Sequence, residues 1–150
     1  MIEKKVVPEK VYLAAKNNLT IAEIATFAEE IIPQLYMQLA ASSLEAAGPI
    51  EFIYHGINGN PETKFDLHVA IPIKAKGKPQ EKFLYYHTRP FSCAYTDYHG
   101  SMAGIKDAWT GLVESVFQAG ITPTEQCREV YKKWAGLDSS ENITELQVGL

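Results

Sequence analysis

Glu129 is the residue best placed to bring a negative charge into a binding site, because the segment around it alternates like a half-buried strand. In residues 126–134, alternation puts Cys127, Glu129 and Tyr131 on one face and Trp134 on the other. A carboxylate among aromatic rings selects a delocalised cation, since the acid supplies charge in a low dielectric and the rings supply cation–π contact. If Trp134 faces the core, however, Glu129 faces water, the ordinary place for a lone acid in a strand.

Aromatic side chains are the second candidate feature, and tyrosines cluster at Tyr85, Tyr86, Tyr95 and Tyr98. Tyrosine offers an apolar body with one polar tip, which suits an adaptable groove. The same residues are also good strand formers on half-buried strands, so the pattern alone leaves both interpretations open. Trp109 has apolar helical spacing that places it either in the core or at a groove wall.

Metal chemistry and nucleophilic catalysis are disfavoured by the spacing of the remaining reactive residues. No pair of histidines has the i, i+4 spacing of a helical metal site; they are His55, His68, His87 and His99. A Gly-rich phosphate loop and Gly-x-Ser-x-Gly are both absent. Cys93 and Cys127 lack CxxC spacing, which predicts two reduced thiols in a cytoplasmic protein. A nucleophile formed by one cysteine with His87 or His99 stays open, although buried strand cysteines are commoner.

The elements that must position these residues begin with a strand at residues 10–16, ending at a turn at Asn17-Asn18. A helix is predicted over residues 21–44, with Thr20 and Glu23 as a capping box. Pro33 predicts a kink or a break in that helix. A hairpin follows, formed by residues 50–57 and 64–73 around turn-forming residues.

The second half of the chain repeats this order of elements. Residues 83–100 predict one or two strands with a bend at Arg89-Pro90. Ser101 begins a second amphipathic helix that stops at Gly120, and strands are predicted at residues 126–134 and 143–150.

The pattern βαββ therefore occurs twice, over residues 1–74 and 83–150, joined by a basic linker at residues 75–82. It predicts an α+β fold with antiparallel sheets and two long helices bordering a central groove.

Composition limits the class of protein further. The chain has 150 residues, 46% of them hydrophobic and 21% charged, which fits one globular domain. The net charge of −4 has the wrong sign for binding a nucleic acid backbone directly. No apolar run is long enough for a signal sequence or a membrane span.

The sequence resembles the GyrI-like small-molecule-binding domain, also called the AraC-type or BmrR-like effector-binding domain, over most of its length. The motifs that carry the resemblance are Tyr98-His99-Gly100, Ala108-Trp109 followed by Leu112, a glycine ending that helix, Arg128-Glu129-Val130-Tyr131, and Phe65-Asp66 through Ala70-Ile71-Pro72. The resemblance implies an aromatic pocket for hydrophobic, often cationic compounds, with Glu129 in the place of a deep acidic residue. Met102 stands where many members have an aromatic residue, and the length leaves no room for a DNA-binding domain, which implies a stand-alone member.

Three functions follow as expectations. The first is a binding protein without a cofactor or metal that captures a hydrophobic, cationic aromatic molecule between its helices. Its candidate ligand-binding residues are Glu129, Tyr131, Trp109, Tyr95, Phe52, Tyr54 and Met102. The second is a hydrolase of strained, cyclopropane-type electrophiles, as the resemblance also implies, with Glu129 as general base and Tyr95 or Tyr131 as acid. The third is an inhibitor that binds a protein partner such as a topoisomerase.

Overall fold

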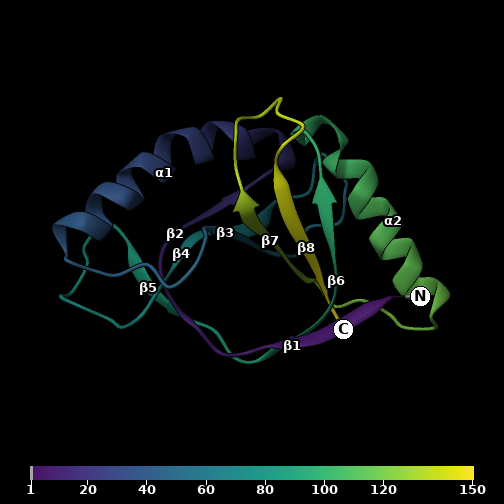
Figure 1. Cartoon of the computed structure of the whole chain (residues 1–150), viewed down its shortest axis with the longest axis horizontal. Coiled ribbons are helices and arrows are strands. Elements are labelled where there is room, and N and C mark those ends of the chain that lie inside the picture. The colour runs from purple at the N-terminus through teal and green to yellow at the C-terminus, as the bar shows by residue number, and fades with distance from the viewer. Residues whose placement is uncertain (1) are drawn as a thin grey trace.

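The computed structural model describes residues 2–150 and shows one eight-stranded antiparallel sheet with two long helices (Figure 1). The predicted α+β class with antiparallel strands and two long helices is confirmed. The elements in chain order are β1 (Glu3–Val7), β2 (Val11–Leu19), a 3-10 turn (Ile21–Glu23), α1 (Ile24–Ala41), β3 (Glu51–His55), β4 (Phe65–Ile73), β5 (Leu84–His87), β6 (Phe91–His99), a 3-10 turn (Met102–Gly104), α2 (Ile105–Gln118), β7 (Gln126–Lys133) and β8 (Ile143–Gly149).

The strand order across the sheet is β1-β6-β8-β7-β3-β4-β2-β5. The order β6-β8-β7 of the second half mirrors β3-β4-β2 of the first across the β7–β3 pair. The outer strands are exchanged, because β1 pairs with β6 and β5 pairs with β2. Internal duplication fits this order, and a superposition of the two halves remains the test of it.

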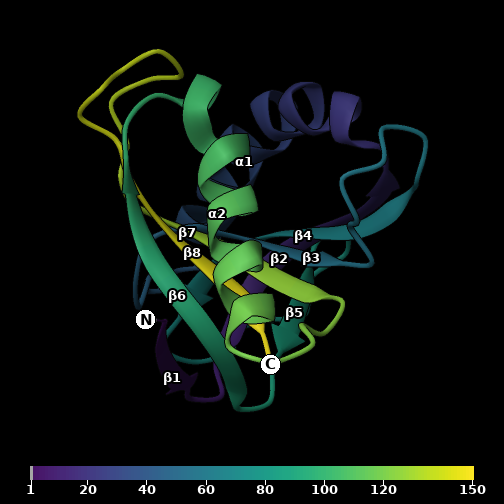
Figure 2. The same ribbon diagram turned by 90° about the vertical axis from the view of Figure 1, so that its right-hand side faces the viewer.

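Both helices lie on one side of the sheet (Figures 1 and 2). Helix α1 packs over β2 and β4, whereas α2 packs over β6 and β8. Their apolar faces cover two clusters, one around Leu35, Phe52 and Leu67 and one around Leu112 and Leu146. Strands β3 and β7 therefore run between the helices at the centre of the sheet.

The opposite face of the sheet is covered by chain connections instead of helices. The β1–β2 and β5–β6 connections run beside each other, and the Thr88 N–H donates to the Lys10 carbonyl at 2.9 Å. The Lys10 N–H donates to the Thr88 hydroxyl at 3.2 Å. Side chains such as Tyr12 and Ile53 are fully buried on this side.

Two local expectations need correction, namely the turn at Asn17-Asn18 and the break in the helix at Pro33. Asn17 and Asn18 continue β2 in register with β4, so the strand extends to Leu19 instead of turning. Pro33 lies inside α1, which runs as one element through it and arches over the sheet in Figure 1. An exposed position allows this, because the proline ring faces water while the neighbouring turns stay hydrogen-bonded.

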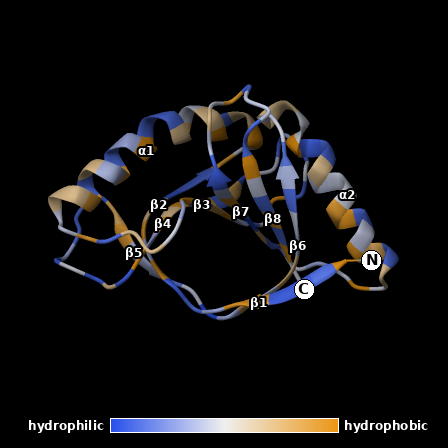
Figure 3. Cartoon of the chain, in the orientation of Figure 1, coloured by the Kyte–Doolittle hydropathy of each residue, from blue (hydrophilic) through white to orange (hydrophobic). Residues whose placement is uncertain are grey.

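Strand β1 lies outside every predicted element, since its sequence EKKVV has only two apolar residues. In Figure 3 it is largely hydrophilic. No helix in residues 2–150 combines the length and the apolar character that crossing a membrane requires.

Candidate functional site

A cluster of five side chains lies on the helix-facing side of β3 and β7, in the interval between the helices. Alternation along β3 directs Phe52 and Tyr54 to this side, and alternation along β7 directs Glu129 and Tyr131 there. Helix α2 contributes Trp109. We call these five residues the interhelical cluster.

The carboxylate of Glu129 is the polar centre of the cluster and is only 6% exposed. Its Oε1 accepts from the Tyr54 hydroxyl at 2.8 Å and from the Tyr131 hydroxyl at 2.6 Å. Its Oε2 accepts from the Trp109 indole N–H at 2.7 Å. All three distances lie within the normal range for hydrogen bonds, so both carboxylate oxygens have partners.

Aromatic rings enclose this carboxylate and extend the cluster outward. Phe52 and Tyr131 meet edge to face with ring centroids 4.9 Å apart. Tyr54 packs against Phe65 at 5.7 Å, and Tyr131 packs against Trp134 at 5.8 Å. The carboxylate is thus held by the polar groups of three aromatic side chains, and the rings of Tyr54 and Tyr131 pack against further aromatic rings.

Burial and the nearby charge of Glu129 raise the pKa of both Tyr54 and Tyr131 well above the usual range for tyrosine. Both hydroxyls therefore stay protonated and act as donors at physiological pH. Burial, followed by the charge of Glu129, also raises the pKa of the Cys127 thiol. A protonated thiol is a poor nucleophile, which argues against the cysteine mechanism left open by the sequence.

The structure brings together Glu129, Tyr131, Trp109, Phe52 and Tyr54 of the seven candidate residues. Tyr95 lies on the opposite face of the sheet, where it packs near Val7, Phe91 and Cys93. Met102 begins the 3-10 turn before α2, and its N–H donates to the Leu137 carbonyl. Neither residue is among the hydrogen-bond partners of Glu129.

Trp134 was expected on the face opposite Tyr131 but contacts the Tyr131 ring. The register of β7 shifts between Tyr131 and Lys133, and such a bulge moves the following side chain to the other face. Trp134 is 50% exposed, so it sits at the margin of the interhelical cluster and not in the core. Phe65 was not among the candidate residues, although the hairpin pattern of β3 and β4 could have placed it beside Tyr54.

No group of three or more histidine, cysteine or acidic side chains is arranged to hold a metal within residues 2–150. Both cysteines are free thiols, and they lie on opposite faces of the sheet.

No protein-family model and no curated protein sequence matches the chain. Among solved structures it is similar to EcmrR, determined in a complex with DNA, with a TM-score of 0.83, 18% identity, and 99% of this chain covered. The chain spans 56% of that EcmrR chain, and 96% of a separately solved EcmrR C-terminal domain, for which the TM-score is 0.82 and the identity 17%.

Two further structures share the fold at lower similarity. SAV2435 bound to tetraphenylphosphonium has a TM-score of 0.70 and 12% identity, covering 99% of this chain and 93% of that one. A hydrolase from Listeria innocua has a TM-score of 0.59 and 9% identity, covering 99% and 90%. At such identities the likeness concerns the fold, which is consistent with the GyrI-like fold that the sequence resemblance implied.

Proposed function

We propose that the chain binds a hydrophobic organic cation between its two helices, with Glu129 as the counter-charge. One observation carries the proposal: Glu129 is buried, and within residues 2–150 it forms no ion pair with a lysine, arginine or histidine. All three hydrogen bonds to its carboxylate come from neutral donors. A buried carboxylate that keeps its charge is costly unless a cation compensates it.

The geometry favours a cation without N–H groups, such as a quaternary phosphonium or ammonium ion. A carboxylate offers about four lone-pair sites, and three are occupied by the aromatic donors. A quaternary cation needs none of them, since it is attracted through space by the charge and by the ring faces. The binding of tetraphenylphosphonium by SAV2435, which shares the fold, supports this ligand class.

The test is calorimetric titration of the protein with tetraphenylphosphonium. Glu129→Gln should weaken binding by about 1–3 kcal/mol, because the variant keeps the shape of the side chain but loses the charge. Glu114→Gln, which removes an exposed acid of α2, should bind like the wild type. A neutral ligand of similar shape, triphenylphosphine oxide, should be insensitive to Glu129→Gln.

Equal affinity of the wild type and Glu129→Gln for tetraphenylphosphonium would contradict the proposal. Tryptophan fluorescence locates the ligand independently. In a Trp134→Phe variant the remaining indole is Trp109, and its emission should be quenched saturably as the cation binds.

Hydrolysis is the second candidate function, because Tyr131 lies within hydrogen-bond reach of Glu129 as the acid–base pair of a hydrolase would require. The fold shared with a Listeria innocua hydrolase supports it. The raised pKa of Tyr131 works against it, since a general acid is most effective when its pKa lies near the working pH. Incubation with strained electrophiles and mass analysis of products separates the two: turnover abolished in both Glu129→Gln and Tyr131→Phe would favour the hydrolase.

A further inference from the structure

The chain has only two arginines, Arg89 and Arg128, and both line one cavity on the face of the sheet opposite the interhelical cluster. The cavity has a volume of about 230 Å³ and is formed by residues 86–91 together with Gln126 and Arg128. Arg128 precedes Glu129 in β7, and successive side chains of a strand point to opposite faces. Arg128 therefore points away from the helices. The cavity is therefore separate from the site of the proposed function.

Arg128 is 1% exposed and forms no ion pair with an acidic side chain within residues 2–150. Its guanidinium lies 4.2 Å from the centre of the Phe91 ring. With the amide oxygen of Gln126 turned toward it, Nη2 donates at 3.0 Å and Nε at 3.2 Å. Nη1 donates to the Tyr12 hydroxyl at 3.5 Å. A guanidinium has five N–H donors, so one N–H on each Nη is left for another acceptor.

Two buried acids on this face, Glu51 and Glu145, are already paired with lysines. Glu51 accepts from the Lys10 ammonium and the Tyr12 hydroxyl, each at 3.0 Å. Glu145 pairs with the Lys5 ammonium at 2.7 Å. The lining of the cavity contains two guanidinium groups and the His87 imidazole but no carboxylate, so its fixed charge is positive.

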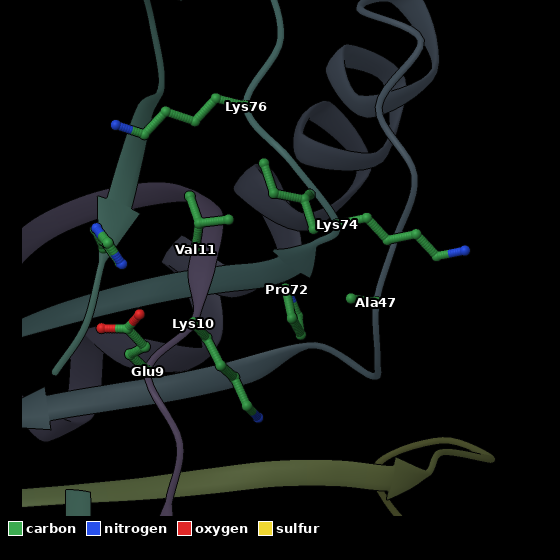
Figure 4. A pocket seen from close by; sticks show the side chains of 9 residues that line it. Glu9, Lys10, Val11, Ala47, Pro72, Lys74 and Lys76 are labelled. Carbon is green, nitrogen blue, oxygen red and sulfur yellow. The ribbon is translucent and has the colours of Figure 1, made fainter. Parts of the chain in front are cut away.

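A larger neighbouring cavity of about 570 Å³ does not share this arrangement. Figure 4 shows that its lysines, Lys10, Lys74 and Lys76, extend in different directions instead of converging. Two of them are also paired, Lys10 with Glu51 and Lys74 with Glu45. The smaller cavity is the one whose lining holds both arginines and no carboxylate.

We propose that the smaller cavity binds a small organic carboxylate, held by the guanidinium of Arg128. The planar fork of an arginine matches the two oxygens of a carboxylate, and the Thr88 hydroxyl and Arg89 lie in the same lining. The rings of Tyr86 and Phe91 offer apolar contact to the rest of the molecule. A volume of about 230 Å³ far exceeds the roughly 30 Å³ that one water occupies in the liquid, which fits an organic anion better than a bare ion.

The test uses benzoate as the probe, at constant ionic strength, followed by calorimetry and by the NMR signals of the Tyr86 and Phe91 rings. Benzoate should bind saturably and shift both rings, whereas benzyl alcohol, which has the same ring without the charge, should not. Arg128→Gln should weaken benzoate binding by about tenfold to a hundredfold, the effect of losing a charged hydrogen-bond partner in a buried site. Arg89→Gln, at an exposed position, should weaken it by roughly two- to fivefold.

Lys132→Gln is the matched control, since it removes one positive charge from the same face of β7 outside the cavity, and its affinity should equal that of the wild type. If Arg128→Gln does not fold, Arg128→Lys keeps the charge without the fork and should still weaken binding. Equal binding of benzoate and benzyl alcohol, no saturable binding, or benzoate affinity that is unchanged in the variants of both arginines would overturn the proposal. Binding of tetraphenylphosphonium serves as an independent measurement, because it depends on the other face.

Discussion

His68 is a buried imidazole whose protonation opposes folding. Its side chain is 6% exposed, its ring stacks on Tyr86 at 4.0 Å, and its Nδ1 has no hydrogen-bond partner within residues 2–150. Burial lowers its pKa to about 4, and the charges of His55 and Lys16 add to the effect, while Asp66 opposes it. The folded protein therefore keeps this imidazole neutral where an unfolded chain, with a histidine pKa near 6.5, would protonate it.

Between pH 6.5 and about 4 the unfolded state binds more protons than the folded state at this site, so stability falls as the pH falls. The loss should reach up to about 3 kcal/mol at the acidic end. Urea denaturation at pH 7 and pH 4.5 should show a smaller decrease for His68→Phe, which keeps the ring stack but cannot be protonated. His99→Gln, at an exposed position, should retain the wild-type dependence, and an identical decrease in His68→Phe would refute the assignment.

Individual side chains could be predicted from the sequence as far as regular alternation reached. Glu129 and Tyr131 share a face because β7 is regular up to Tyr131, and Trp134 was misplaced because the bulge beyond Tyr131 leaves no mark in the sequence. Tyr95 could not be assigned, since a tyrosine that alternates along a strand fits either face until the pairing partners are known. The burial of Arg128 could not be predicted from the sequence. It depends on chain connections, distant in the sequence, that cover the face of the sheet opposite the helices.

At the start of α1, residues close together in the sequence determine the structure of the first turn. The Thr20 N–H donates to Oε1 of Glu23 at 3.0 Å, and the Thr20 hydroxyl contacts the same oxygen at 3.0 Å. These hydrogen bonds lower the pKa of Glu23. The capping box predicted from the sequence is thus confirmed, because it involves only neighbouring residues.

Thr20→Ala should destabilise the protein by about 0.5–2 kcal/mol, since it removes the hydroxyl that hydrogen-bonds Oε1 of Glu23 in the first turn. Thr26→Ala is the matched control at an exposed position within α1 and should be neutral or slightly stabilising, because alanine is the better helix former. The free energy of unfolding in urea measures both. A Thr20→Ala variant as stable as Thr26→Ala would show that packing alone fixes this end of the helix.

Short edge strands were harder to predict than helices, for a physical reason. Strand β1 has the sequence EKKVV, too short to show a hydrophobic period, and was missed, whereas β5, with LYYH, lies within the strands predicted over residues 83–100. Each forms a strand because it pairs with a strand that is far away in the sequence. Glu3 of β1 aligns with Tyr95 of β6, and His87 of β5 aligns with Val11 of β2. Such pairings join segments that are far apart in the chain, so no local sequence pattern indicates them.

For the whole molecule, the exchange of β1 and β5 ties the two halves together. Each half completes the sheet edge of the other, and the β3–β7 pair joins them at the centre. Neither βαββ unit then has its full set of pairings alone, although the linker at residues 75–82 carries no strand of its own.

Fragments 1–76 and 77–150, expressed separately, should each lack a cooperative thermal transition, and mixing them should restore one. Circular dichroism melts and amide NMR spectra of the fragments and of the mixture measure this. An intact chain with a Gly-Ser insertion in the linker should melt close to the wild type, because lengthening a loop costs little. An independently folded fragment would show that the exchanged strands are dispensable.

The exchange also sets an order of events during synthesis on the ribosome. Glu3 leaves the exit tunnel about 90 residues before its partner Tyr95, a delay of roughly 5–20 s at ordinary rates of translation. Through this interval β1 has no strand to pair with, and the outer edge of β2 and the inner edge of β3 stay open to other chains. The inner edge of β3 stays open longest, because its partner β7 lies at Gln126–Lys133, so the exposure to aggregation lasts well into the synthesis of the second half.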